Sequence, residues 1–169
     1  MQSLAPLAAC VKALDLKTDT FDNRILAQKT MYLFQLMGAD LGYRFSWELR
    51  GPYARELAVA LDQVTLEWET LKGYTLRREV DERAGALRAA LDTVPDGMSR
   101  ADWAELLASV HYLKHISPEP KQKGLPCIIG HLRTLKPDRF TDQQLDDACN
   151  TLKSLGLWDV KTARANGLR

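Results

Sequence analysis

Residues 43–71 read YRFSWELRGPYARELAVALDQVTLEWETL, and the rest of the chain is organised around them. Phe45, Trp47 and Leu49 alternate with polar residues, and this period of two predicts a short strand with one apolar face. Gly51 follows, and glycine adopts backbone angles that are closed to other residues. The sequence therefore predicts a strand that ends at a sharp corner.

A long amphipathic helix is expected after this corner. Pro52 suits the first turn of a helix, because its missing N–H would have no partner there. Apolar residues then recur at intervals of three and four, which places them on one face of a helix: Leu57, Leu61, Val64, Trp68 and Leu71. Strand, corner and helix are thus expected to bury their apolar sides against the remaining segments.

The composition is that of a small globular protein. The chain has 169 residues, of which 46% are hydrophobic, enough for a core in one domain or in two small halves that share one. Lys and Arg number 23 and Asp and Glu 22, so the net charge of +1 does not indicate a nucleic-acid-binding protein overall, although it leaves room for a local basic patch.

Cysteine usage and hydropathy predict a cytoplasmic protein without a membrane anchor. The three cysteines are isolated from one another in the sequence, which indicates reduced, buried thiols: Cys10, Cys127 and Cys149. No basic-then-apolar leader opens the chain, and no apolar run approaches ~18 residues.

Apolar periodicity predicts further helices at about residues 4–14, 25–37, 80–91, 103–113, 126–135 and 145–155. Asp22 or Asn23 is the expected cap of the second of these, in which Gln28 and Lys29 are expected to point away from the apolar stripe or to extend along it. Gly38 is expected to end it. The turn at residues 95–97 separates an N-terminal half, 1–97, from a C-terminal half, 98–160, and residues 161–169 form a polar tail.

The C-terminal half has the order of elements of a winged helix-turn-helix. A helix begins at Pro126, the link KPDRF follows, and Thr141 and Gln144 form a capping box before the next helix. The apolar segment GLWDV, residues 156–160, is expected to add a strand. We therefore expect a mainly α protein with short β-strands, winged helix-turn-helix-like, its helices packed around a small hairpin or strand.

The strand-to-helix segment 45–57, with WAELLASVHYLKHI and FTDQQLDDACNTLKSLGL further along, resembles the YwgA-type family of small bacterial and archaeal proteins. The resemblance covers residues 25–158 and implies no particular activity, because that family has no well-established one. More distantly the chain is similar to Panacea antitoxin-like domains, although it lacks their shorter, more aromatic strand. That likeness implies binding to a protein partner, in a regulatory, toxin-linked or defence-linked setting.

Two basic clusters are candidate binding sites. Arginines surround the corner near the expected N-terminus of a helix, where free N–H groups favour anions; the candidates are Arg44, Arg50 and Arg55, with Tyr53 beside them and with Gly51 and Pro52 as the structural corner. The alternative is that Arg50 and Arg55 pair with Glu48 and Glu56. A second cluster follows residue 113 and comprises Lys121, Lys123, Arg133 and Arg139, with Lys114 and Lys136 nearby.

Catalytic and metal-binding patterns are weak. His111 and His115 have a spacing that suits zinc, with His131 as a third candidate, but the Glu of the metalloprotease signature is missing. Cys127 stands at an expected helix start within an apolar run, where packing is favoured over reactivity. Phosphate-binding and nucleophile motifs are absent from the sequence, so we expect no catalytic residue, no metal and no cofactor.

These observations predict a non-catalytic binding module that recognises a protein partner or its own copy. A winged-helix regulator that binds nucleic acid is the alternative. Against it, the first turns of the expected recognition helix carry Asp142, Asp146 and Asp147, which repel a polyanion, although Gln143, Gln144 and Asn150 could read bases.

Overall fold

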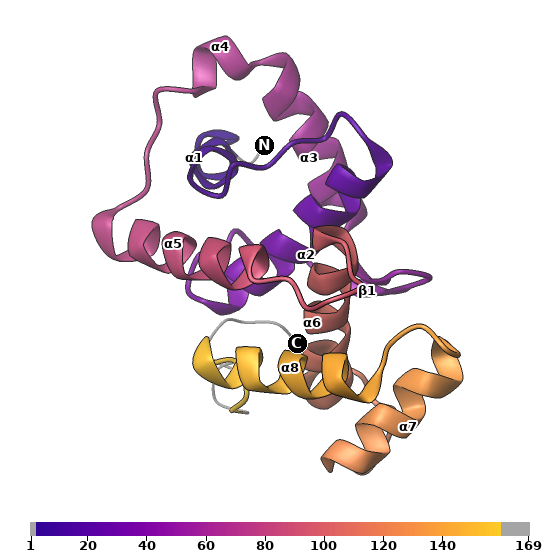
Figure 1. The fold of residues 1–169 in the computed structure, drawn as a ribbon. Helices are drawn as coiled ribbons and strands as arrows, with labels where there is room; N and C mark the ends of the chain where they lie inside the picture. Colours follow the sequence, from indigo (N-terminus) through magenta and orange to yellow (C-terminus); the bar gives the residue numbers. More distant parts are fainter. Residues whose placement is uncertain (1–2, 160–169) are drawn as a thin grey trace.

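The computed structural model describes residues 3–159, which form a mainly α structure of eight helices and one hairpin (Figure 1). The elements are α1 (Ala5–Ala13), α2 (Phe21–Leu36), β1 (Ser46–Glu48), β2 (Gly51–Tyr53), α3 (Arg55–Leu66), α4 (Trp68–Leu71), α5 (Arg78–Asp92), α6 (Arg100–His115), α7 (Leu125–Leu135) and α8 (Asp142–Ser154). The mainly α character expected from the sequence, with short strands, is confirmed.

Helix α6 occupies the centre of the structure. It packs against α2, α5, α7, α8 and strand β2, and most of its side chains are buried. On one side, α3, α4 and α5 curve around α1, while α7 and α8 lie on the other (Figure 1). One core of aliphatic and aromatic side chains runs through these elements.

The hairpin β1–β2 is antiparallel, with Trp47 opposite Pro52. Gly51 has a φ of +90°, which confirms the sharp turn predicted for it. Pro52, however, lies in β2 and not in a helix, so that prediction is wrong. Its carbonyl is held by a side chain from α2, and the helix begins only at Arg55.

Leu49 is also not where the alternation places it. Phe45 and Trp47 pack against the core, but Leu49 is 90% exposed. Strand β1 ends at Glu48, so Leu49 belongs to the tip of the hairpin, where the period of two no longer applies. The expected apolar face therefore consists of Phe45 and Trp47 alone, and Leu49 faces solvent.

The helix after the hairpin is shorter than predicted. Leu57, Leu61, Val64 and Leu71 are buried as the stripe requires, but α3 ends at Leu66 and α4 follows as a separate turn. Glu67 lies between them with φ −100° and ψ 16°, outside the helical range, and this break redirects the chain around α1.

Side-chain caps explain where three other helices begin. Thr20, not Asp22 or Asn23, caps α2, because its hydroxyl accepts the backbone N–H of Asn23. Ser99 caps α6. The capping box predicted for Thr141 and Gln144 is present at α8, with both reciprocal hydrogen bonds formed.

The C-terminal half matches the expected helix, link and helix, but residues 157–159 form no strand. Val160 and the tail 161–169 lie outside the described residues. Leu135, the last residue of α7, is substantially exposed. The hairpin precedes α3 in the chain and does not follow α8, so the specific winged arrangement is not established by these elements.

The tryptophans and cysteines differ from one another in how deeply they are buried. Trp103 is fully buried and its indole N–H donates to the Ala90 carbonyl at 3.0 Å, whereas the other three tryptophans are only partly buried. Cys10 and Cys149 are buried, and burial raises the pKa of Cys10 to about 12. Cys127 is exposed, so the prediction that it packs is wrong. It faces outward from α7, whose buried residues are Ile128 and Leu132.

Within residues 3–159, none of the helices combines the length and the apolar character that crossing a bilayer requires.

The tight packing at the hairpin predicts a large effect of Gly51→Ala. A Cβ there would lie 2.6 Å from the Ser109 hydroxyl, and φ is +90°. We expect a loss of about 2 kcal/mol in the free energy of unfolding, measured by urea denaturation. Gly85→Ala is the matched control, because its Cβ meets nothing and the helix gains about 0.5–1 kcal/mol. Equal effects at both glycines would contradict the turn as described.

Candidate functional site

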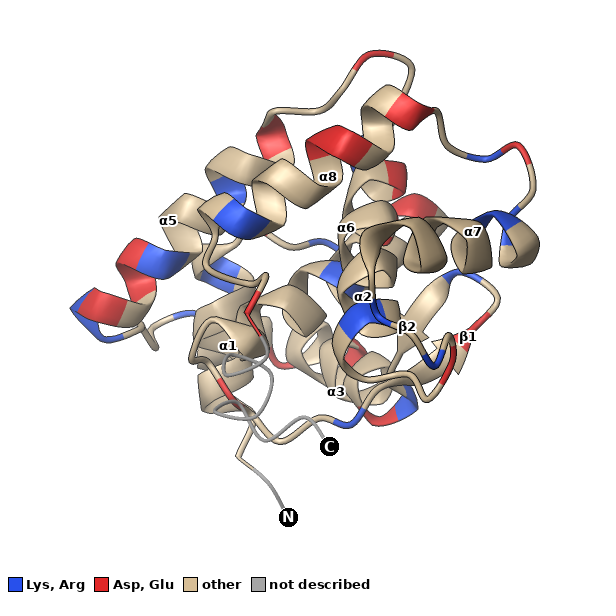
Figure 2. Ribbon diagram, turned by 90° about the horizontal axis from the view of Figure 1, so that it is seen from below, with Lys and Arg blue, Asp and Glu red and all other residues tan. Residues whose placement is uncertain are grey.

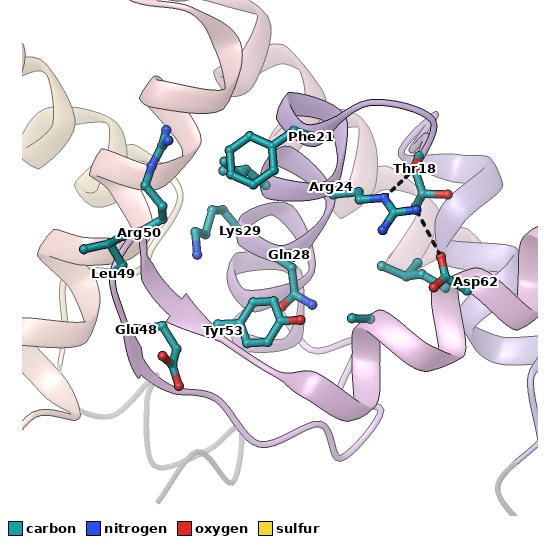
Figure 3. Close-up of a pocket in the computed structure, with 13 residues that line it drawn as sticks. Thr18, Phe21, Arg24, Gln28, Lys29, Glu48, Leu49, Arg50, Tyr53 and Asp62 are labelled. Carbon is teal, nitrogen blue, oxygen red and sulfur yellow. Dashed lines mark hydrogen bonds and ion pairs between the residues drawn. The ribbon is translucent and has the colours of Figure 1, made fainter.

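A groove of about 570 Å³ lies between α2, the hairpin and α3 (Figure 3). Its walls come from α2 with the residues just before it, from the hairpin and from α3, and its lining includes apolar, cationic and acidic side chains. The lining residues are Thr18, Phe21, Arg24, Ile25, Gln28, Lys29, Glu48, Leu49, Arg50, Tyr53, Ala58, Leu61 and Asp62.

Three large apolar side chains at the groove are turned towards solvent. Leu49 at the hairpin tip is 90% exposed, Phe21 at the start of α2 is 69% exposed, and Tyr53 at the end of β2 is 37% exposed. Single exposed apolar residues are ordinary on a protein surface, but three around one concavity form a patch. Such a patch is typical of an interaction site.

Polar side chains of α2 form the floor of this groove. The Gln28 side chain donates to the Ala54 carbonyl at 2.9 Å and accepts the Ala54 N–H at 3.0 Å. Lys29 donates from Nζ to the Pro52 carbonyl at 2.6 Å. Both side chains are buried, so neither predicted arrangement, pointing away from the apolar stripe or extending along it to solvent, is found. They face β2 and Ala54, which follows it, and supply partners for the backbone there.

The surroundings of Lys29 destabilise the charged form of its side chain. Its pKa is lowered to about 8, mainly by burial; the positive charges of Lys136 and Arg50 act in the same direction, and the negative charges of Glu105 and Glu48 act in the opposite one. In Figure 3, Lys29 lies in the middle of the labelled lining residues, and its ammonium points towards the hairpin.

A buried carboxylate, Glu105 of α6, stands behind the hairpin tip. It is fully buried and accepts from Arg50 at 2.9 Å, from Lys136 at 3.0 Å and from Arg139 at 2.7 Å. Asp102, one turn earlier on α6, accepts from the same two arginines. Lys136 also donates to the Leu49 carbonyl, so this ionic cluster ties the hairpin to α6 and to the link after α7.

This cluster places the first set of predicted site residues. Arg50 bonds to Asp102 and Glu105, and not to Glu48 as the pairing alternative expected. Arg44 and Arg55 are exposed on either side of the hairpin, and Tyr53 lines the groove. The hairpin thus brings Arg50 and Tyr53 to one groove but leaves the other two arginines outside its lining. Gly51 and Pro52 form the buried inner edge of β2.

Most cations of the second predicted cluster are engaged by the protein itself. Lys123 donates to the carbonyls of Leu113 and Ser117, which closes its own loop. Arg133 pairs with Asp142, and Arg139 belongs to the ionic cluster around Glu105. Lys114 lies over the Trp158 ring, and Lys121 is exposed. These residues hold loops together more than they form one basic surface.

His111 and His115 are neighbours on α6, with ring centroids 4.6 Å apart. His111 Nδ1 shares a hydrogen bond of 2.7 Å with the Tyr32 hydroxyl. Burial holds the pKa of His111 well below its usual range, and the charges of His115 and Lys114 add to this effect. His131 does not join them, and among the described residues no group of three or more suitable side chains could hold a metal ion.

Charges of both signs are interleaved along the elements. In Figure 2, Lys and Arg segments alternate with Asp and Glu segments and do not collect on one face of the view. The early turns of α8 are acidic, as the sequence indicates, and Asp142 and Asp146 are exposed there.

Comparison of the chain with protein-family models, with curated proteins and with solved structures finds no match in any of the three.

The buried position of Glu105 leads to a prediction about stability. Glu105→Gln would leave Arg50, Lys136 and Arg139 facing a neutral amide in a buried site, and we expect a loss of about 3 kcal/mol in urea unfolding. Asp102→Asn removes a partly exposed partner of the same arginines and is the matched control, with an expected loss of about 1 kcal/mol or less. A larger loss at Asp102 would contradict the central role of Glu105.

His111 leads to a prediction about pH. In the unfolded chain its pKa is about 6.5, whereas in the folded protein it is lowered. Unfolded protein therefore binds more protons below about pH 6.5, so this contribution to stability is present above that pH and is lost as the pH falls. We expect the stability advantage over His111→Gln to shrink by roughly 1 kcal/mol between about pH 7.5 and about pH 5.5. A difference that stays constant in urea titrations would show that His111 does not titrate in this way.

Proposed function

We propose that this protein is a non-catalytic binding module that recognises a protein partner through the groove between α2, the hairpin and α3. The observation that carries the proposal is the exposure of Leu49, Phe21 and Tyr53 around one concavity. Burial of such side chains is the main favourable term in most protein association. Central apolar anchors of this kind, with a polar surround, are typical of protein interfaces.

The construction of the groove supports this proposal. Leu49 stands at the tip of a hairpin whose backbone is fixed by Lys29 of α2 and by Lys136 beyond α7. A contact residue on a fixed backbone loses little freedom when it binds, which favours affinity. An unpaired leucine at a tied-down tip has no structural task, so its exposure is best explained by a partner.

The distant similarity to Panacea antitoxin-like domains agrees with a protein partner, and we extend the proposal to a regulatory or toxin-linked role. We also retain a winged-helix-like relationship for α7, α8 and the link between them as part of the proposal. Self-association through the same groove is the variant of the proposal in which the partner is a second copy.

Nucleic-acid binding is the less favoured reading. Arg50, Arg133 and Arg139 are paired with carboxylates of this chain, and phosphates would have to compete with those partners. The exposed carboxylates Asp142 and Asp146 on the first turns of α8 would repel a duplex at the place where a recognition helix enters a groove.

Leu49→Ser tests the proposal. Loss of a leucine anchor corresponds to about 1.5–3 kcal/mol, so we expect binding to a partner, or to a second copy, to weaken at least about tenfold. Partners would be captured from the producing cell by affinity purification and identified by mass spectrometry, and the affinity of the purified pair measured by calorimetry. Sedimentation would report self-association.

Leu66→Ser is the matched control, because this leucine of α3 is 85% exposed and does not line the groove. Both variants should unfold like the parent protein, since neither side chain is buried. Equal weakening by the two substitutions, or none by either, would contradict a role for the groove. Steeply salt-dependent binding to duplex DNA, unaffected by Leu49→Ser, would favour the nucleic-acid alternative.

A further inference from the structure

The floor of the groove contains a cation that the fold does not fully satisfy. Lys29 is 2% exposed, and its ammonium carries three donor hydrogens. Within residues 3–159 its one hydrogen-bond acceptor is the Pro52 carbonyl, and it forms no ion pair closer than 4.0 Å. Buried charges in proteins are normally paired, so two donors without partners at the floor of a groove point to an external acceptor.

The charges around Lys29 favour an acceptor that is negative. Four cations belong to this region: Lys29 itself and the three that contact Glu105, which are Arg50, Lys136 and Arg139. Three carboxylates face them: Glu48, Asp102 and Glu105. One positive charge is left over on the hairpin side of the groove, near Lys29. On the side formed by the start of α2 and by α3, Arg24 and Asp62 pair with each other at 3.9 Å and cancel (Figure 3).

We propose that the groove takes a linear segment of a protein partner in which an Asp or Glu side chain is flanked by apolar residues. The carboxylate accepts from the ammonium of Lys29, and the apolar neighbours lie against Leu49, Phe21 and Tyr53. This inference rests on the proposed function and adds the chemistry of the ligand. A charged pair in a largely desolvated groove is a strong determinant of which peptide binds.

A random linear peptide library displayed on phage, selected against the full chain, tests the inference. We expect the enriched sequences to share one acidic residue between apolar ones. Synthetic copies should bind the parent protein at least about tenfold more tightly than copies in which that residue is changed from Glu to Gln or from Asp to Asn. Because this comparison uses the parent protein, it does not depend on how any variant folds.

Lys29→Met provides the other half of a double-mutant cycle. Methionine matches the length of the side chain without its charge, and the variant should bind acidic and amide peptides equally, so that the two changes together weaken binding no more than either alone. In the parent protein, the Lys29 pKa of about 8 should rise when the acidic peptide binds, which NMR of the ¹³Cε resonance would follow.

The outcomes separate the inference from the function on which it rests. Enriched peptides without a shared carboxylate that still lose affinity with Leu49→Ser would overturn the acidic ligand and leave the protein-binding groove standing. Peptides whose affinity depends on neither Lys29 nor Leu49 would overturn both. Failure to enrich any peptide, or a Lys29 pKa that stays constant on binding, would overturn the inference.

Discussion

The hairpin β1–β2 and the residues that flank it need backbone partners from elsewhere in the chain, and this need organises the structure. Its strands have three residues each, too few for an independent sheet. Helix α2 supplies the partners: Gln28 pairs with both backbone groups of Ala54, Lys29 holds the Pro52 carbonyl, and Gln35 pairs with both backbone groups of Tyr43. Helix α2 thus buries polar side chains, because leaving these buried backbone groups without hydrogen-bond partners would destabilise the structure more.

On its other side the hairpin is fixed by α6 and by the link beyond α7. Gly51 approaches Ser109 so closely that no side chain fits, and Arg50 reaches Glu105. Lys136 donates both to the same carboxylate and to the Leu49 carbonyl, so α6 and the link after α7 are joined at the hairpin tip. The tip is therefore anchored through its backbone while its leucine side chain stays in water, and the groove beside α2 is the space that this arrangement leaves open.

Local signals in the sequence predicted the helices, the turn at Gly51 and the capping box at Thr141, because each depends on a few adjacent residues. The groove could not be found in this way. Gln28 and Lys29 look like solvated residues of an amphipathic helix unless the position of β2 is known. The sequence offers Arg50 either an external anion or a nearby carboxylate such as Glu48, whereas its partners lie more than fifty residues away on α6. Pairing between polar groups that are distant in the sequence produces no periodic pattern from which it could be predicted.

The contrast between Gln28 and Lys29 bears on what α2 does beyond holding the hairpin. Gln28 and Gln35 fix backbone groups with neutral amides, which need little compensation when buried. Lys29 fixes a single carbonyl, a task that an amide donor could also perform, yet it brings a charge into a buried site that lowers its own pKa. A group that is more polar than its structural task requires is characteristic of functional sites. The positive charge of Lys29 borders a groove whose rim consists of exposed apolar side chains. This charge gives the groove a preference among ligands that the apolar rim alone would not provide.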